Sequence, residues 1–158
     1  MANHKQVEKK RPTVLAAGVF DLLHLGHVKF LEEVKKAGGE DAELIVIVAR
    51  DKTVEKRKGE KPVMSENQRR ALVESLEVVD EAILGYEEFN IDEVIEKIKP
   101  DVIAVGHDQK GIGELVKNAI ADKGLKIKLV RIGKFTEDEL NSSSEIKKKI
   151  IQLYRRQA

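Results

Sequence analysis

Short apolar runs alternate with amphipathic segments along the chain, as expected when strands alternate with helices. The predicted strands are residues 13–17, 43–49, 79–84, 101–105 and 127–132. Residues 44–48 of the second run are Leu, Ile, Val, Ile and Val, an unbroken apolar stretch that is typical of a strand covered on both faces. The runs therefore predict a sheet that is buried between layers of helices.

Helices are predicted between these strands, and their boundaries carry recognisable signals. A residue such as Ser or Asn, whose side chain accepts hydrogen bonds, indicates a helix N-terminus when Glu or Gln follows three positions later. Such pairs occur at Ser65 with Gln68, Asn90 with Glu93, and Ser142 with Glu145. The predicted helices are residues 26–37, 65–76, 90–99, 112–123 and 142–154, whereas the lysine-rich residues 50–62 are expected to form a charged loop.

Strand–helix alternation of this kind predicts an α/β fold. The expected architecture is a Rossmann-like, doubly wound, parallel five-stranded sheet with helices on both faces. Residues 12–158 are expected to form one domain, after a flexible polar tail over residues 1–11. Ligands of such sheets bind beyond the carboxyl ends of the strands. Functional residues are therefore expected in the segments that follow each strand.

Composition narrows the class of protein. The 158 residues include 29 Lys and Arg against 28 Asp and Glu, and these charges are interspersed, so no nucleic-acid partner is expected. The chain has no cysteine, which excludes disulfides and thiolate nucleophiles and fits a cytoplasmic protein. No apolar run is long enough to span a bilayer, so no membrane partner is expected.

The segment from Gly18 to His27 is the most informative. It follows the first predicted strand and opens the first helix, with His24 and His27 on either side of Leu25 and Gly26. Unpaired amides and the helix dipole attract anions at this end of a helix, and imidazoles add donors for phosphate oxygens. Two histidines can also be a surface pair, satisfied core residues or zinc ligands, although no acid or cysteine companion favours zinc. We favour phosphate binding.

The motifs in this chain resemble those of the cytidylyltransferase-like nucleotidyltransferase family. Gly18-Val-Phe-Asp and His24-Leu-Gly-His27 are similar to its signature, and Lys58-Gly59 with Pro62-Val63 to its mobile lysine loop. Residues 65–74 resemble its arginine-bearing helix, and Ser142-Ser143-Ser144 the cluster that opens its last helix. Within the family the chain resembles the archaeal FAD synthases, through residues 48–56, Val79-Asp-Glu-Ala-Ile, Gly106-His-Asp-Gln109 and residues 140–144.

The resemblance implies a reaction and several roles. The acceptor phosphate attacks the α-phosphorus of a nucleotide in line, without a covalent enzyme intermediate. His24 and His27 then donate to the triphosphate, Lys58 bridges the α-phosphate and the acceptor phosphate, and Arg69 holds the departing pyrophosphate. Lys56, Arg57 and Lys61 compete with Lys58, and Arg70 competes with Arg69; each can also be an ordinary surface residue.

Further nucleotide contacts are expected from the other matched positions. They are Val19, Phe20, Leu25, Gly26, Asp108, Phe135, Ser143 and Ser144. Val19 stands where the family often has Thr, so its contact would come from the backbone amide. Asp108 would meet the ribose or base, and Phe135 would cover the base. The alternatives are a turn-forming aspartate, a core phenylalanine and, for the serines, plain helix capping.

Three functions follow as hypotheses. The first is transfer of AMP from ATP to FMN, giving FAD and pyrophosphate, with a divalent cation, Mg²⁺, as cofactor. The second is a cytidylyltransferase that uses CTP with glycerol 3-phosphate or a phosphorylated amino alcohol. The third is a non-catalytic nucleotide-binding module. Relatives also suggest a homodimer.

Overall fold

Five parallel strands form a sheet with the spatial order β3-β2-β1-β4-β5. The computed structural model describes residues 10–136 and 141–157. The strands are β1 (Thr13–Gly18), β2 (Glu43–Val48), β3 (Glu81–Leu84), β4 (Val102–Gly106) and β5 (Lys128–Ile132). The chain steps outward from β1 through β2 to β3, then crosses back to β4 beside β1 and on to β5. The topological switch point therefore lies between β1 and β4.

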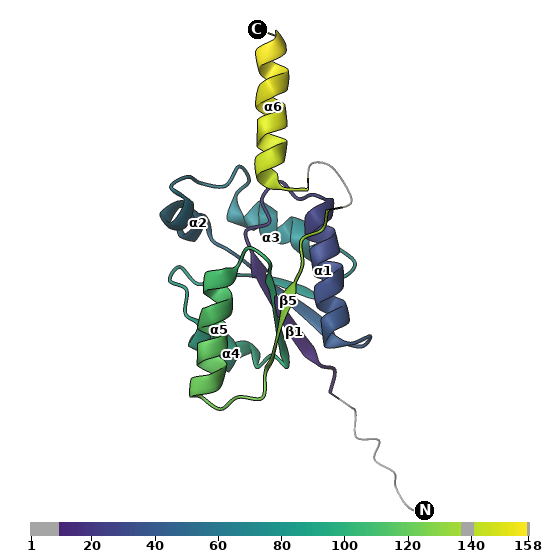
Figure 1. Ribbon diagram of the computed structural model, residues 1–158, viewed down its shortest axis with the longest axis vertical. Coiled ribbons are helices and arrows are strands. Elements are labelled where there is room, and N and C mark those ends of the chain that lie inside the picture. Colours follow the sequence, from purple (N-terminus) through teal and green to yellow (C-terminus); the bar gives the residue numbers. More distant parts are fainter. Residues whose placement is uncertain (1–9, 137–140, 158) are drawn as a thin grey trace, which may run out of the picture.

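Helices cover both faces of the sheet (Figure 1). Helices α1 (Leu25–Gly38) and α3 (Glu66–Glu74) pack on one face, and α4 (Ile91–Ile98) and α5 (Lys110–Asp122) pack on the other. The short α2 (Asp51–Lys58) precedes α3, and α6 (Ser143–Gln157) extends away from the body. The predicted Rossmann-like, doubly wound sheet is therefore confirmed.

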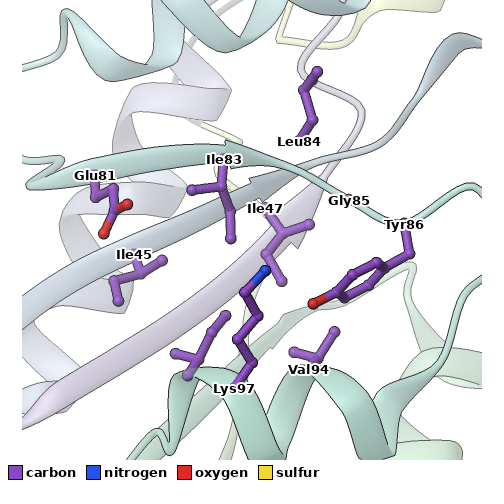
Figure 2. Close-up of a pocket in the computed structure, with 10 residues that line it drawn as sticks. Ile45, Ile47, Glu81, Ile83, Leu84, Gly85, Tyr86, Val94 and Lys97 are labelled. Carbon is purple, nitrogen blue, oxygen red and sulfur yellow. The ribbon is translucent and has the colours of Figure 1, made fainter.

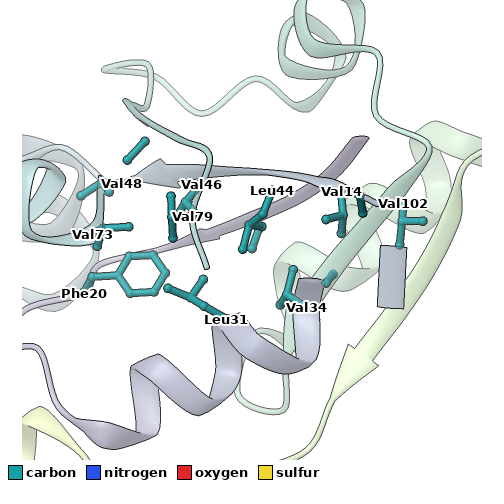
Figure 3. Packing of buried hydrophobic residues seen from close by; sticks show 14 residues of the cluster. Val14, Phe20, Leu31, Val34, Leu44, Val46, Val48, Val73, Val79 and Val102 are labelled. Carbon is teal, nitrogen blue, oxygen red and sulfur yellow. The ribbon is translucent and has the colours of Figure 1, made fainter. Parts of the chain in front are cut away.

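The larger apolar cluster lies beneath α1 and α3 (Figure 3). Leu31 and Val34 of α1 and Val73 of α3 are fully buried against Leu44 and Val46 of β2. Each fully buried side chain of this size contributes roughly 1.5–3 kcal/mol relative to an exposed one. This packing fixes α1, and with it the helix N-terminus that carries the two histidines.

The prediction of a loop over residues 50–62 was wrong, because residues 51–58 form α2. This segment has one buried residue, Val54, and so shows no helical periodicity. Its N-terminal cap comes from a distant residue, because the Glu66 carboxylate accepts a hydrogen bond from the Asp51 amide at 2.7 Å, whereas the adjacent Gly59 ends the helix with φ of +80°. Tertiary capping, which a local pattern cannot reveal, stabilises this helix.

The last residue that was assigned to the predicted tail contacts the body of the domain. Residues 1–9 lie outside the described residues, so their conformation stays a prediction. Arg11, the last residue assigned to the tail, donates to the Asp41 carbonyl at 2.9 Å and pairs with Asp80 at 3.4 Å. Arg11 therefore makes ordered contacts with the domain. Among the described helices, none is both long and apolar enough to cross a bilayer.

Candidate active site

The loop that joins β1 to α1 has an unusual backbone. Phe20 and Leu22 adopt positive φ angles of 54° and 48°, which are uncommon for bulky residues and cost free energy unless the surroundings enforce them. Packing supplies that constraint, since the Phe20 ring is 3% exposed in the main apolar cluster. Phe20 is expected from the sequence to contact the nucleotide. Its ring is packed in the core, so only its backbone can make that contact.

The two histidines form a stacked pair where α1 begins. Their ring centroids are 3.7 Å apart with an interplanar angle of 26°. His24 is the N-cap residue, and its backbone N–H donates to Nδ1 of His27 at 3.3 Å. With Nδ1 occupied as an acceptor, neutral His27 carries its proton on Nε2. His27 is thereby prepared to donate a hydrogen bond through Nε2.

Burial keeps both imidazoles neutral. Desolvation lowers the pKa of His24, and desolvation together with repulsion from His24 lowers the pKa of His27 to about 4. Nδ1 of His24 is buried and has no partner among the described residues. A buried polar atom without a partner is costly, so holding His24 in this position reduces the stability of the fold.

The low pKa of His27 predicts acid destabilisation. Between pH 6.5 and 4 the unfolded chain binds a proton that folded His27 excludes, so the free energy of unfolding falls as the pH drops through this window. The loss attributable to His27 is on the order of 2–3 kcal/mol, reduced by its partial exposure. Urea unfolding at several pH values measures it, and His27→Gln should flatten the dependence. An equal slope in both proteins would refute the assignment.

Gly26 is required by its surroundings. A Cβ atom there would lie 2.8 Å from the Asn141 carbonyl oxygen and 2.9 Å from Cε1 of His24. Both contacts are closer than real Cβ atoms approach, so one of these neighbours would have to move. The segment that leads into α6 therefore passes directly over the start of α1.

Replacing Gly26 by alanine is expected to lower turnover by about tenfold to a hundredfold, because displaced catalytic groups lose their alignment. Steady-state kinetics of the variant measure the effect. Gly111→Ala is the matched control, since a Cβ there meets nothing within 4 Å. A Gly26→Ala enzyme with normal kcat would contradict this role.

Asp21 connects the histidine loop to two other segments. Its buried carboxylate accepts hydrogen bonds from the amides of Val63 at 2.7 Å and Met64 at 3.0 Å. Its carbonyl accepts a hydrogen bond from the Ser143 hydroxyl. Asp21 thus holds the segment before α3 and the start of α6 against the histidine loop.

The serine cluster lies where it was expected, beside the histidine loop. Ser142 Oγ accepts a hydrogen bond from the Glu145 amide at 3.2 Å, so the predicted capping is confirmed. Ser143 is half-buried with its hydroxyl committed to Asp21, whereas Ser144 is exposed. Of the two serines proposed to bind phosphate, Ser144 has the hydroxyl more open to a ligand.

The turn after β4 completes this edge of the sheet. Asp108 is exposed there, and its charge is close enough to raise the pKa of His27 against the larger effect of burial. Gln109 donates to the Ala17 carbonyl of β1 at 2.9 Å and accepts from the Gly106 amide at 2.8 Å. Gln109 therefore ties the two strands at the switch point together. Gln109 belongs to the motif Gly106-His-Asp-Gln109, but the sequence alone indicates no role for it.

Arg69 lies in the interior rather than in an open cleft. Its side chain is 0% exposed and donates to the Met64 carbonyl at 3.0 Å, the Val19 carbonyl at 2.6 Å and the Asp51 carboxylate at 2.7 Å. All three guanidinium nitrogens thus have protein acceptors. The expectation that Arg69 holds the leaving pyrophosphate does not fit this arrangement, because burial and these bonds withhold the guanidinium from a ligand.

Lys58 and Phe135 are less closely tied to the histidines. Lys58 is exposed in the last turn of α2, and among the described residues no hydrogen bond or ion pair joins it to His24 or His27. Phe135 is half-buried, and its carbonyl accepts a hydrogen bond from the Asn141 side chain at 2.6 Å. Leu25, 44% exposed, opens α1 between the histidines.

Metal ligands are sparse in the described part of the chain, where no group of three or more His, Asp or Glu side chains could hold an ion. Two exposed carboxylates act on the histidine pair, Asp108 on His27 and Glu145 on His24, whereas Asp21 is engaged by backbone amides. Such sparse carboxylates fit a Mg²⁺ ion that takes its other ligands from phosphates and water.

Comparisons with known proteins agree with this geometry. Residues 15–149 match the model of the cytidylyltransferase-like family. The chain is 50% identical to the FAD synthase of Ferroglobus placidus, covering 89% of this chain and 88% of the relative. It is 48% identical to the FAD synthases of Methanobrevibacter smithii and Thermoplasma volcanium, covering 87% and 89% of this chain and 89% and 94% of those proteins.

A solved structure supports the same conclusion. The crystal structure of a protein described as a lipopolysaccharide core biosynthesis protein, from Thermoplasma volcanium, is 43% identical with a TM-score of 0.72. The match covers 80% of this chain and all of that one. The predicted family is thus confirmed by sequence as well as by fold: the chain belongs to the cytidylyltransferase-like family of nucleotidyltransferases.

Proposed function

We propose that the chain is an FMN adenylyltransferase, which transfers AMP from ATP to FMN and releases pyrophosphate. The observation that carries the proposal is the neutral, stacked His24–His27 pair at the N-terminus of α1, above the switch point. Transfer of a nucleotide needs hydrogen-bond donors to the phosphate oxygens, and the pair supplies them. Relatives that are about half identical to the chain are named FAD synthases.

In the proposed reaction, a phosphate oxygen of FMN attacks the α-phosphorus of ATP. The bond from that phosphorus to the oxygen bridging to the β-phosphate breaks, and the electron pair leaves with pyrophosphate. His27 Nε2–H and the amides that begin α1 donate to oxygens that gain charge in the transition state. Preorganised donors and positioning, rather than proton transfer, supply the rate enhancement.

The other assignments complete the proposed site. Ser144 and the first amides of α6 bind phosphate oxygens, and Asp108 contacts the ribose or base. Lys58 neutralises charge between the two substrates, which requires the exposed end of α2 to approach the histidine pair. Phe135 and the backbone of Val19 and Phe20 border the nucleotide. Arg69 acts indirectly, since it fixes the Val19 carbonyl and the start of α2.

Mg²⁺ is proposed as the cation, bound mainly by the triphosphate, with Asp108 as an exposed carboxylate beside His27. When bound, it neutralises phosphate charge and orients the leaving group. We also infer a homodimer as the working form, because several apolar side chains of α6 are exposed in the single chain.

The test supplies the purified protein with Mg²⁺ and ATP plus FMN, and separately with CTP plus glycerol 3-phosphate or a phosphorylated amino alcohol. FAD and pyrophosphate are expected in the first mixture alone. Turnover with CTP alone would replace the proposal by a cytidylyltransferase, and no turnover in any mixture would favour a binding module. Omitting Mg²⁺, or replacing it by Ca²⁺, tests the cation.

A further inference from the structure

Strands β1 and β4 separate before their carboxyl ends. Their pairing stops at Ala16 opposite Ala104, although β1 runs to Gly18 and β4 to Gly106. The pairing of β1 with β2 instead continues to the last residue of β1. Strands β2 and β3 likewise stay paired up to Leu84, beside the surface groove shown in Figure 2. Along this edge the sheet therefore opens between β1 and β4, at the topological switch point.

The side chain of Gln109 occupies the gap where the β1–β4 pairing stops. The Gly18 carbonyl accepts a hydrogen bond from Ala49, which follows β2, and successive carbonyls of a strand point to opposite sides, so the Ala17 carbonyl points toward β4. If the register continued, its donor would be the Gly106 amide. Instead, Oε1 of Gln109 accepts from the Gly106 amide at 2.8 Å, and Nε2 donates to the Ala17 carbonyl at 2.9 Å. The side-chain amide is thus inserted between two backbone groups that continued pairing would join directly.

Side chains also hold the rest of this strand end. The Gly106 carbonyl accepts a hydrogen bond from the Arg131 guanidinium at 3.2 Å. A Cβ atom at position 106 would lie 3.0 Å from Oδ1 of Asp108 and 3.5 Å from Oε1 of Gln109. Gly106 is buried and Gln109 is half-buried, whereas Asp108 is exposed between them. The position of the turn that carries Asp108 therefore depends on Gln109.

The two separated strand ends lead to different parts of the proposed nucleotide site. Strand β1 leads into the histidine loop, which is proposed to bind the triphosphate, and β4 leads into the turn with Asp108, which is proposed to contact the ribose or base. The two sides lie close enough for the charge of Asp108 to act on His27. Because one nucleotide has to reach both sides, the separation of the strand ends sets the distance between its phosphate and nucleoside subsites.

We propose that Gln109 is a spacer, whose side-chain amide holds the ends of β1 and β4 apart at the separation that a nucleoside triphosphate needs. An amide suits this task because it offers both an acceptor and donors, so each backbone group keeps a partner while the crevice stays open. This role rests on the proposed function, in which the nucleotide binds at the switch point. Gln109 acts through its neighbours and is therefore a positioning residue.

Replacing Gln109 by alanine removes the spacer and is expected to let the Gly106 amide bond directly to the Ala17 carbonyl. The melting temperature should change little, because the two backbone groups recover a partner in each other. Nuclear magnetic resonance can detect the new bond as a scalar coupling between the Gly106 nitrogen and the Ala17 carbonyl carbon, present in the variant and absent in the wild type. A variant without this coupling, or one that is unfolded or strongly destabilised, would make Gln109 an ordinary structural tie and overturn the proposal.

Nucleotide binding gives a second readout that a merely structural residue would not change. In calorimetry with Mg²⁺ and no FMN, the Kd for ATP should rise at least about tenfold in Gln109→Ala, because the two subsites no longer match one ligand. The Kd for pyrophosphate, which occupies the phosphate subsite alone, should stay within about twofold of the wild-type value. Gln109→Asn, with the same groups on a shorter arm, should weaken ATP binding by a smaller factor.

Gln152→Ala is the matched control, because Gln152 is exposed on α6, and it should leave both Kd values unchanged. An unchanged Kd for ATP in Gln109→Ala, or an equal loss for ATP and pyrophosphate, would overturn the spacer role. FAD formation by the wild type is measured separately. ATP binding without FAD formation would refute the enzymatic function and leave the test of Gln109 intact, whereas a wild type that binds no ATP would overturn both.

Discussion

Replacing His27 by alanine is expected to lower kcat for FAD formation by about a hundredfold or more, because removing one preorganised donor to a developing charge typically costs that much. His27 is the stronger candidate of the pair, since its Nδ1 is held by the His24 amide and its Nε2–H is free to face a ligand. The measurement is pyrophosphate release at saturating ATP and FMN, with thermal unfolding to show that the variant is folded.

Other substitutions of His27 serve as controls for this prediction. His27→Gln keeps a side-chain N–H donor and should recover part of the lost rate, whereas His27→Phe keeps the size of the ring and should not. His4→Ala changes a residue outside the described part of the chain and should leave kcat unchanged. Equal kcat in the wild type and the His27→Ala enzyme would remove the central role proposed here and leave the fold assignment intact.

The fold could be predicted because its signals are local. Continuous apolar runs such as residues 44–48 give β2, and the Ser65 and Asn90 caps were found from residue type and spacing alone. Helix α2 could not be predicted, because its N-terminal amide is capped by Glu66, 15 residues away. A local sequence pattern cannot show that a distant residue of the same chain caps the helix in the folded structure.

The site residues also divide into those that a local pattern reveals and those whose roles depend on the tertiary fold. The histidine pair was found because strand, glycine and helix follow one another directly in the sequence. The contacts that hold it are long-range: Asp21 to Val63, Gln109 to Ala17 and Arg69 to Val19. A resemblance to a motif could point to Arg69, but it could not show which way the side chain faces. Burial, which depends on the packed structure, reassigns it from a ligand contact to a positioning residue.

Replacing Arg69 by leucine is therefore expected to destabilise the protein by about 3–5 kcal/mol. The change leaves the Asp51 carboxylate and two backbone carbonyls without their hydrogen-bond donor. The melting temperature should fall by roughly 10 °C. Arg69→Lys should recover little of this loss, since one ammonium cannot reproduce a planar fork that reaches three acceptors. Arg70→Leu is the matched control: Arg70 is partly exposed and pairs with Glu74, so the expected loss is below about 1 kcal/mol.

Kinetics separate the two possible roles of Arg69. As a positioning residue, Arg69 should couple to Asp51, so that Asp51→Asn and Arg69→Leu lose less stability together than the sum of their separate losses. As a phosphate ligand, Arg69 would instead give a variant of normal stability with a raised KM for ATP. The buried guanidinium, with a protein acceptor for each nitrogen, predicts the first result, in which activity falls because the Val19 carbonyl and the start of α2 are no longer held beside the histidine loop.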